Sequence, residues 1–388
     1  MRITCIGGGP AGLTFAILAA SAGHDATVIE RQSPDASFGW GVVFWNDLLG
    51  QLERHDEALA ATMRDHAYTW RDQVVVVDDH EPVRIASSGY SMRRRTLLEL
   101  LRRRAHQVGV RLVDDHFVGD PGAVAADLVI ASDGVGSDIR SRLPGFGTQR
   151  TVRRNRYLWL GAEREFESFT FPFVATPAGW LWAHAYGFAP GLSTFIVETT
   201  PQTWAALGFD RLDGDAAARR LEELFAGSLD GARLHPQQSL RQRQPWAQFV
   251  QVTNRRWHVG RVALMGDAAH TTHFTIGSGT RLAMEDAMCL ADALAGQPRV
   301  EAALSTYEST RRAAIADAQQ AAARSADWYE RAPRYLRNRS PHDVARLMDD
   351  RRSPVMGRLP VSLYLSLTRL AGRVPAVEST ARRLVSHF

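Results

Sequence analysis

Three glycines near the start of the chain have the spacing that binds the phosphates of a dinucleotide. They form the segment Gly7-x-Gly9-x-x-Gly12, directly after a β-branched run, with Pro10 and Ala11 inside it. Such glycines permit a tight turn, close approach of the backbone to a pyrophosphate at a helix N-terminus, and close helix-to-strand packing. Glu30 ends the next expected strand about 20 residues further on, where an acid accepts hydrogen bonds from a ribose. The segment therefore predicts a dinucleotide site.

Two histidines and a tyrosine are the candidate proton-transfer groups. In the segment WLWAHAY, strand alternation places Trp182, His184 and Tyr186 on one face. His273 stands in a second segment that also contains aromatic residues. Because imidazole exchanges protons near neutral pH, we predict that His184, His273 and Tyr186 are catalytic. Packing of the same face against helices remains an alternative for its tryptophans.

The elements expected around these residues define an interleaved α/β fold. Strands and helices alternate through the first third of the chain, and an aromatic-rich stretch from 157 to 198 alternates as a mostly antiparallel sheet. We predict a Rossmann-like nucleotide-binding domain interleaved with a mostly antiparallel β-sheet substrate domain, followed by a helical C-terminus. The predicted boundaries are 1–75, 91–155 and 256–310 for the nucleotide domain, 76–90 and 156–255 for the sheet domain, and 311–388 for the helical region.

Composition excludes several classes of function. None of the 46 basic residues is a lysine, which excludes a pyridoxal Schiff base, a P-loop lysine and a lysine nucleophile. The basic runs are typical of amphipathic helices, so we expect no nucleic-acid partner. Two isolated cysteines predict no metal site. The chain has no long apolar run or leader segment, so we expect a cytoplasmic monomer or homodimer without a membrane anchor.

Two further motifs follow the glycine segment. They are Asp133-Gly134-x-x-Ser137-x-x-Arg140 and Gly266-Asp267-Ala268-Ala269-His270. Each alone is equally an ordinary turn or strand end. The three motifs in this order resemble those of single-component FAD-dependent aromatic monooxygenases of the para-hydroxybenzoate hydroxylase type, and the resemblance extends to about residue 295. It implies cofactor contacts at Gly7, Gly9, Pro10, Ala11, Gly12, Glu30, Arg31, Val42, Arg94, Asp133, Gly134, Gly266, Asp267, Gly277, Gly279 and Thr280.

The resemblance also implies a reaction. In that family NAD(P)H reduces FAD, O2 adds to the flavin, and a C4a-hydroperoxyflavin transfers oxygen to an electron-rich aromatic ring. FAD, NAD(P)H and O2 are therefore the expected cofactor and co-substrates, and the cofactor carries the difficult step. The protein must hold the ring, exclude water and stabilise developing charge. Gly277 and Gly279 would bring backbone close to the flavin ring at the start of a helix.

Several long segments indicate a subgroup of this family. Where many members have a proline, this chain has His273-Phe274-Thr275-Ile276. Residues 273–287, with residues 38–47, 180–186 and 193–198, resemble aryl-CoA hydroxylases such as salicylyl-CoA 5-hydroxylase and the monooxygenase part of anthraniloyl-CoA monooxygenase. They resemble, more loosely, the tryptophan-dimer hydroxylase of violacein biosynthesis. We therefore expect 5-hydroxylation of a small aromatic CoA thioester such as salicylyl-CoA. The expected pocket residues are Trp40, Phe44, Trp45, Trp182 and Phe274.

Other functions stay open at this point. The substrate could instead be an indolic aromatic or one tethered to a carrier protein, and a non-oxygenating flavin reductase would share the cofactor motifs. A flavin-dependent halogenase is disfavoured, because Trp180-x-Trp182 lacks the following Ile-Pro and the chain has no lysine. The aromatic residues at 40–45 could equally pack as a hydrophobic staple.

Overall fold

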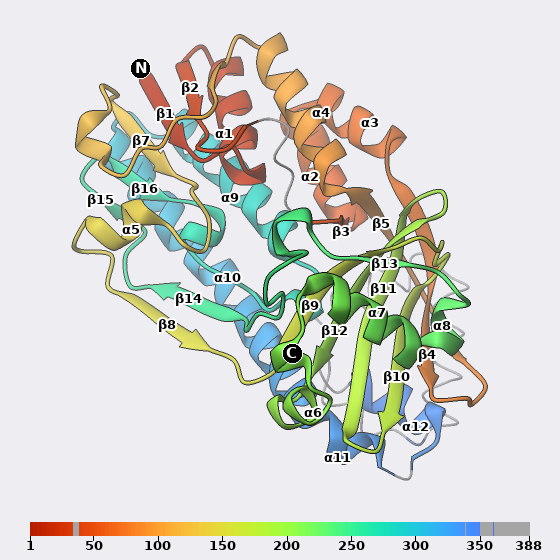
Figure 1. Ribbon diagram of the computed structural model, residues 1–388. Helices are drawn as coiled ribbons and strands as arrows, with labels where there is room; N and C mark the ends of the chain where they lie inside the picture. The colour runs from red at the N-terminus through yellow and green to blue at the C-terminus, as the bar shows by residue number, and fades with distance from the viewer. Residues whose placement is uncertain (34–38, 338, 350–359, 361–388) are drawn as a thin grey trace.

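The structure is a computed structural model that describes residues 1–33, 39–337, 339–349 and 360. Two large sheets and a long helix that extends along both organise these residues (Figure 1). The mixed α/β fold class is confirmed. The part of the predicted helical region beyond residue 349, other than residue 360, lies outside the described residues, as does Phe38 of the segment at 38–47.

A parallel sheet forms the nucleotide-binding half. Its strand order is β15-β16-β7-β1-β2-β6, and every pair is parallel except β15 with β16. Strand β7 is buried throughout and wholly apolar, as expected where helices cover both faces of a parallel sheet. Helix α1 packs against α4 and α9. The bounds are β1 (Arg2–Ile6), β2 (Asp25–Ile29), β6 (Arg111–Val113), β7 (Leu128–Ala131), β15 (His258–Val259), β16 (Val262–Leu264), α1 (Pro10–Ser21), α4 (Arg94–Gln107) and α9 (Gly279–Gly296).

An eight-stranded sheet forms the second half, in the order β13-β9-β12-β11-β10-β4-β5-β3. All its pairs are antiparallel except β10 with β4. The bounds are β3 (Gly41–Phe44), β4 (Tyr68–Val77), β5 (Val83–Arg93), β9 (Arg156–Ala162), β10 (Phe169–Thr176), β11 (Gly179–Ala189), β12 (Leu192–Thr199) and β13 (Leu234–His235). The predicted boundary at 75/76 differs from this topology, because β3 and most of β4 precede it yet pair with β5.

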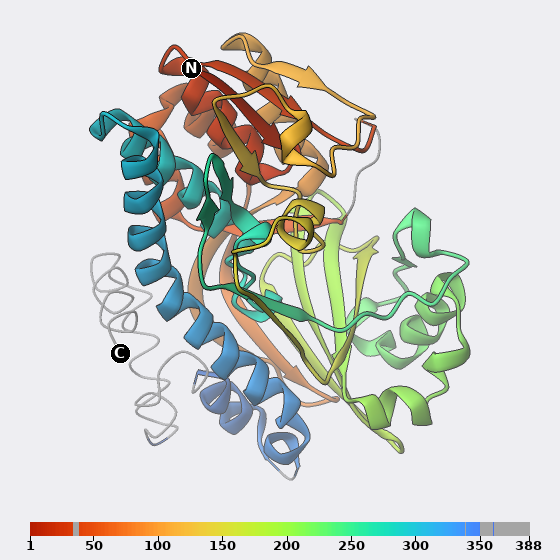
Figure 2. The same ribbon diagram turned by 90° about the vertical axis from the view of Figure 1, so that its left-hand side faces the viewer.

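Helices cover both faces of the eight-stranded sheet. Figure 2 shows the sheet between α10 on one side and the short helices α6–α8 on the other. Helix α10 contacts α9 and the η5 turn, so it connects the two halves of the molecule. The bounds are α6 (Pro201–Ala206), α7 (Gly214–Leu224), α8 (Ala226–Leu229), α10 (Val300–Glu330), α11 (Ala332–Leu336) and α12 (Pro341–Asp349).

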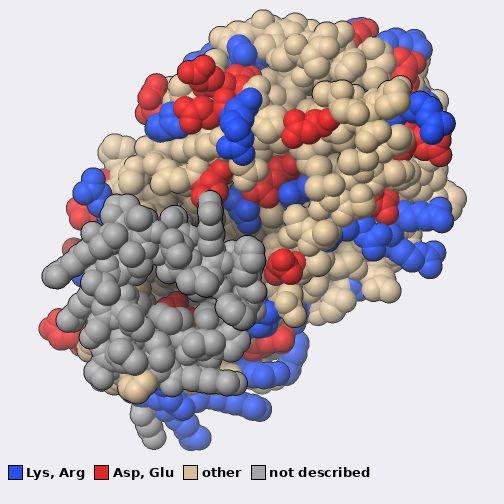
Figure 3. All heavy atoms as spheres, turned by 180° about the vertical axis from the view of Figure 1, so that it is seen from behind, with Lys and Arg blue, Asp and Glu red and all other residues tan. Residues whose placement is uncertain are grey.

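Shorter elements connect the sheets. They are α2 (Asn46–His55), α3 (Glu57–Asp65), α5 (Asp138–Arg142), the paired strands β8 (Thr148–Val152) and β14 (Val250–Asn254), and the 3-10 turns η1 (Pro121–Ala123), η2 (Phe209–Arg211), η3 (Gln238–Leu240), η4 (Gly266–Ala268) and η5 (Phe274–Ile276). None of the described helices is both long and apolar enough to cross a membrane. Arginine and acidic side chains are interspersed over the upper part of the face that Figure 3 shows.

Gly9 and Gly12 differ in what a side chain would meet, which allows a direct test of the glycine turn. A Cβ at Gly12 would collide with the Gly7 carbonyl oxygen, whereas a Cβ at Gly9 would meet no described protein atom within 4 Å. We expect Gly12→Ala to destabilise the protein by about 1–3 kcal/mol through overpacking. Gly9→Ala should preserve the melting temperature of FAD-free protein and weaken FAD binding. Thermal melting and FAD titration of both variants check this, and equal loss of stability would contradict it.

Candidate active site

The glycine segment forms the turn between β1 and α1, as its spacing predicts. Gly7 has a φ of +108°, a conformation that L side chains rarely adopt. Helix α1 begins without a side-chain cap, so its first N–H groups can bind an anion. Glu30 accepts hydrogen bonds from the N–H groups of Gly8 at 2.7 Å and Gln32 at 2.9 Å. Its carboxylate thus lies beside the turn, with lone pairs remaining for ribose hydroxyls.

Hydrogen bonds join the three motifs at one edge of the parallel sheet. The Ser132 hydroxyl, just after β7, donates to the Gly7 carbonyl at 2.9 Å. The buried Arg140 donates to the Ala268 carbonyl at 2.9 Å, so the Asp133 segment is bonded to the Gly266-Asp267 segment. All three motifs follow the carboxyl ends of β1, β7 and β16, where open α/β sheets bind their ligands.

Asp267 lies at this edge of the sheet, three residues after the end of β16. It follows Gly266, whose φ is +62° and where a Cβ would lie 3.0 Å from the Ala11 Cβ. Asp267 is exposed to solvent although protein surrounds it, and we interpret this as a position on the wall of a cleft. This crowding raises the pKa of Asp267, while the charges of His270 and Arg94 act in the opposite direction.

Arg94 lies between the acidic groups of two motifs. It is the first residue of α4 and is half-buried. Burial lowers the pKa of Arg94, while the charges of Asp267 and Glu30 raise it. Its backbone N–H donates to the Trp40 carbonyl at 2.7 Å, which connects α4 to the segment before β3. A guanidinium in this position can donate hydrogen bonds to phosphates or hydroxyls of a cofactor.

The residues at the cleft fit bound FAD. Asp133 Oδ1 is buried and has no hydrogen-bond partner among the described residues, while Oδ2 accepts from the Ile139 N–H at 3.3 Å. A Cβ at Gly134 or Gly279 would meet no described protein atom within 4 Å, as at Gly9. Open backbone beside an uncapped helix N-terminus is the environment that a dinucleotide pyrophosphate requires. The residues that would hold FAD are Gly7, Gly9, Glu30, Arg94, Asp133, Gly134, Gly266, Asp267 and Gly279.

A buried ionic network supports the Gly266-Asp267 turn, and the sequence analysis missed most of it. Asp286 on α9 accepts from the Gly266 N–H at 3.0 Å, and the same oxygen lies 2.8 Å from His270 Nε2. Arg311 Nε donates to its other oxygen at 2.7 Å. Burial would raise the pKa of Asp286, but His270 and Arg311 outweigh burial and lower it. The available signal was the pair of adjacent acids, Glu285 and Asp286, between apolar residues of the expected helix.

One face of the eight-stranded sheet is aromatic, as strand alternation predicts. The β11–β12 register pairs Trp182 with Glu198 and His184 with Ile196, and directly paired residues share a face. The opposite face packs Leu181 and its neighbours against α7. The sequence analysis missed Glu198, because only its pairing with Trp182 across β11 and β12 places it on the aromatic face.

Glu198 is a buried carboxylate among polar groups. Glu198 is only 1% exposed to solvent. Asn155 Nδ2 donates to Oε1 at 2.8 Å, and Trp182 Nε1 donates to Oε2 at 3.0 Å. His184 Nε2 lies 3.8 Å from Oε2. Burial would raise the pKa of Glu198, but His184, His273 and the Asn155 hydrogen bond outweigh burial and lower it. The carboxylate is therefore ionised at neutral pH.

His273 is the second buried imidazole of the site. Its ring lies 4.7 Å from Phe249 and 4.4 Å from Phe274. Nδ1 lies 3.0 Å from Thr275 Oγ1, which in turn lies 2.8 Å from Ser325 Oγ on α10. Burial lowers the pKa of His273 to about 4, so the ring is neutral at neutral pH.

The depressed pKa of His273 predicts a pH-dependent loss of stability. Unfolded protein binds a proton at this residue below pH 6.5, whereas folded protein resists protonation until about pH 4. Stability should therefore fall as pH drops through this window, by up to about 3 kcal/mol from this residue. Melting curves of wild type and His273→Gln between neutral and acidic pH test this. The difference in stability between them should shift in favour of the variant as pH falls, and a constant difference would contradict the assignment.

Phe274 connects the aromatic face with the cofactor cleft. Its ring lies 4.8 Å from Tyr157 and 5.7 Å from His184, which it meets edge to face. Burial raises the pKa of Tyr157, and the charge of Asp267 raises it further, so Tyr157 lies within electrostatic reach of the cleft. His184, His273 and Phe274 thus lie together, and their catalytic and pocket roles stay predictions.

Tyr186 has a different environment from the two histidines. Its hydroxyl donates to the Gly41 carbonyl at 2.8 Å, and the Gly41 N–H donates to Thr194 Oγ1 at 2.7 Å. These two bonds hold the start of β3 against β11 and β12. Burial raises the pKa of Tyr186 strongly. In this arrangement the hydroxyl positions β3, and a catalytic role for Tyr186 stays a prediction.

The three predicted pocket tryptophans pack against glycines or Tyr329, whereas Phe44 lies in a hydrophobic core. The Trp40 ring covers Gly161, where a Cβ would lie 2.6 Å from it, and Trp45 packs against the φ-positive Gly277. Trp182 is fully buried and stacks on Tyr329 at 5.8 Å. Phe44 is also fully buried and belongs to the core of the nucleotide half, which is the packing alternative for this segment.

The remaining predicted cofactor residues range from exposed to buried. Arg31 is exposed, Val42 is buried opposite Met92 in the β3–β5 pair, and Thr280 is half-buried in the first turn of α9. Pro10 is the first residue of α1. None of these contacts argues for or against a place beside FAD.

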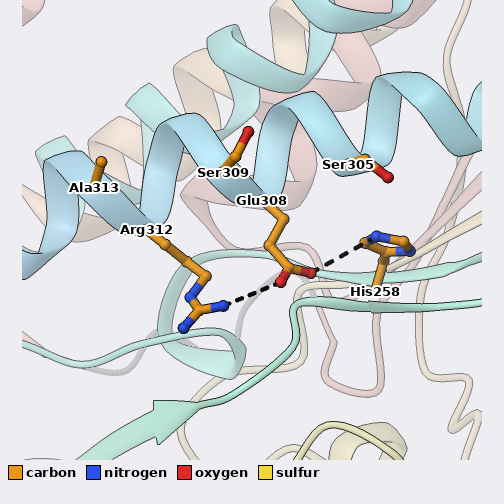
Figure 4. A pocket seen from close by; sticks show the side chains of 6 residues that line it. All are labelled: His258, Ser305, Glu308, Ser309, Arg312 and Ala313. Carbon is orange, nitrogen blue, oxygen red and sulfur yellow. Dashed lines mark hydrogen bonds and ion pairs between the residues drawn. The ribbon is translucent and has the colours of Figure 1, made fainter.

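A surface hollow lies apart from the three motifs. Side chains of α10 and His258 line it, and Figure 4 shows Glu308 between Arg312 and His258. Glu308 pairs with Arg312 at 3.2 Å and His258 at 3.7 Å, and it also accepts from the Trp257 N–H at 2.8 Å. These polar groups satisfy one another, so we interpret the hollow as a structural contact between α10 and β15.

Comparisons with known proteins agree with this geometry. The family described as FAD binding domain matches residues 83–322, and the family described as lycopene cyclase protein matches residues 3–146. The chain is 40% identical to 3-hydroxy-4-methyl-anthranilyl-(aryl-carrier protein) 5-monooxygenase of Streptosporangium sibiricum, over 89% of this chain and 93% of that protein. It is 38% identical to salicyloyl-CoA 5-hydroxylase of a Streptomyces species, over 87% of this chain and 67% of that protein.

A solved structure shares the fold. The tetrameric form of 2-methyl-3-hydroxypyridine-5-carboxylic acid oxygenase superposes with a TM-score of 0.69 at 21% identity, covering 89% of this chain and 96% of that one. The family model matches residues 83–322, and the two relatives are 40% and 38% identical to the chain, so the family of the chain can be assigned. The chain belongs to the FAD-binding-domain family of flavin-dependent aromatic monooxygenases, with FAD as its cofactor and O2 as its oxidant.

Proposed function

We propose that this enzyme hydroxylates the ring of an aromatic acyl thioester, with NAD(P)H as the reductant. The observation that carries the proposal is the position of His184, on the aromatic sheet face, beside Phe274, which with His273 follows the Gly266-Asp267 turn in the chain. An electron-rich ring that bears a hydroxyl or amino group needs aromatic contacts and a nearby base. This face offers both.

The thioester part of the proposal rests on the relatives. One is named for a substrate on an aryl-carrier protein and the other for a CoA substrate, and each is named as acting at position 5. We propose a CoA thioester such as salicylyl-CoA first, hydroxylated at position 5. A carrier-protein thioester is the second candidate. It is supported by the monooxygenase of Streptosporangium sibiricum, because the match covers 93% of that protein.

The residues of the chain have distinct tasks in this reaction. Bound FAD would supply two parts of the chemistry, which are the reaction with O2 and the transfer of an oxygen atom. Glu30, Arg94 and Asp267 would hold the cofactor at the edge of the parallel sheet. Phe274 would contact the substrate ring, and the buried aromatic face would exclude water. A histidine on this face would hold the proton of the ring hydroxyl or amino group.

One assay tests the proposal. NAD(P)H oxidation and product mass should be followed with salicylyl-CoA, anthraniloyl-CoA, the same aryl groups on a carrier protein, the free acids and indolic compounds. We expect a thioester to stimulate NAD(P)H oxidation and to yield hydroxylated product, while free acids give little. Preference for a free acid or an indolic compound would contradict the thioester proposal, and NADH and NADPH compared in parallel identify the reductant.

A further inference from the structure

Glu198 is the least expected group on the aromatic face. An ionised carboxylate is costly to bury unless hydrogen bonds or opposite charges compensate. Asn155 and Trp182 donate one hydrogen bond to each of its oxygens. Both donors are neutral, so they do not balance the charge. The positive charge that His184 gains when it accepts a proton, with Nε2 at 3.8 Å from Oε2, would balance it.

We propose that Glu198 is a positioning residue that holds His184 as the base for the substrate's ring hydroxyl. This inference rests on the proposed function. In the step, the hydroxyl O–H bond breaks, its electron pair stays on the ring oxygen, and the proton moves to an imidazole nitrogen of His184. After oxygen transfer the proton returns to that ring oxygen, so the step consumes no net proton.

The register of the sheet explains why this pair exists. Glu198 and Trp182 are direct neighbours across β12 and β11, and His184 is two residues further along β11 on the same face. When the imidazole gains the substrate proton, the carboxylate near Nε2 stabilises the resulting imidazolium.

The surroundings of the two histidines favour His184 over His273 for this task. The pKa of His273 is about 4 because of burial, which makes it a weak base at neutral pH. The charge of Glu198 acts against burial and raises that pKa, while the charge of Arg153 lowers it. Nδ1 of His273 already lies 3.0 Å from Thr275 Oγ1.

Other titratable groups near His184 come from three elements. Tyr329 on α10 has its ring 5.0 Å from the imidazole, and His273 directly precedes Phe274 of η5, whose ring lies 5.7 Å from it. Tyr157 on β9 contacts the same Phe274 ring at 4.8 Å. Among these, Glu198 is the one negative charge at neutral pH in the described residues around the imidazole. Among the described residues, removing the charge of Glu198 should therefore have a large effect on the proton transfer.

Glu198→Gln is the direct test, because it preserves size and removes charge. Asn155 can turn its amide to match a glutamine, so we expect the fold and the FAD content to be retained. The matched control is Glu167→Gln, an exposed glutamate between β9 and β10. Both variants are assayed as holoenzymes with salicylyl-CoA or its carrier-protein thioester, whichever the wild type converts.

We expect Glu198→Gln to lower kcat about 10- to 100-fold near neutral pH, with KM within about twofold of wild type. The deficit should narrow as pH rises, because the ring hydroxyl then ionises without a base. The control should match wild type throughout. An unchanged kcat, or the same loss at every pH, would overturn the inference, since a purely structural role would not depend on the ionisation of the substrate.

Trp182→Phe keeps the inference testable if Glu198→Gln does not fold. It retains a ring that can stack on Tyr329 and removes one donor from Oε2. A smaller fall in kcat with the same narrowing at high pH supports the inference, and a pH-independent effect overturns it. Failure of the proposed function is distinguishable, because wild type would then give no hydroxylated thioester at any pH.

Discussion

Asp267→Ala should purify as folded protein that has lost about nine-tenths or more of its FAD. The side chain lies within electrostatic reach of Arg94 and His270 and is exposed to solvent, and no described hydrogen bond uses it to hold the turn. The turn itself depends on Gly266 and Asp286, which the substitution leaves in place. Loss of one hydrogen bond between a charged group and the cofactor weakens binding by about 1.5–3 kcal/mol, enough to strip FAD during purification.

The measurement is the ratio of visible flavin absorbance to protein absorbance, with circular dichroism as the test of folding. Asp317→Ala is the matched control, since it removes an exposed carboxylate from α10. The control should retain a full complement of FAD. Stoichiometric flavin in Asp267→Ala would contradict the cofactor site described above.

His184→Ala should retain FAD and lose most hydroxylation. The side chain is 2% exposed and lies among Phe171, Phe274 and Tyr329, none of which belongs to the three cofactor motifs. Loss of a positioned base typically costs about 100-fold or more in rate. His273→Ala should lower product formation less, because the low pKa of His273 limits its use as a base.

Product formation per flavin is the quantity to compare. His106→Ala, an exposed histidine on α4, is the matched control. Continued oxidation of NAD(P)H without hydroxylated product in His184→Ala would agree with a role in the oxygen-transfer step. Unchanged product in both His184→Ala and His273→Ala would show that the aromatic face only packs.

The nucleotide half could be predicted from sequence because its signals are local. Gly7, Gly9 and Gly12 encode a turn, and an apolar strand on each side encodes a buried parallel sheet. The boundary near residue 75 was harder, since β4 and β5 form a hairpin whose partners, β10 and β3, are distant in sequence or separated by two helices. Strand alternation identifies a strand but does not name its neighbour.

In the candidate site, too, local patterns predicted some residues, while those that depend on tertiary contacts were missed. Alternation along β11 placed Trp182 and His184 on one face correctly, whereas Glu198 needed the β11–β12 register, which no local pattern supplies. Phe44 was expected in a pocket, but its apolar side chain suits a core equally well, and its stacking on Tyr90 at 5.7 Å comes from tertiary packing. Arg311 could not be found from sequence, because its partner Asp286 is on another helix.

Oxygen labelling tests the central claim most directly. Wild-type holoenzyme is supplied with NAD(P)H, isotopically labelled O2 and salicylyl-CoA or its carrier-protein thioester, and the product is analysed by mass spectrometry. A monooxygenase of an aryl thioester should place one labelled oxygen atom on the ring at position 5, with the thioester intact. Reduced flavin and consumed NAD(P)H with no labelled oxygen in any thioester product would contradict it.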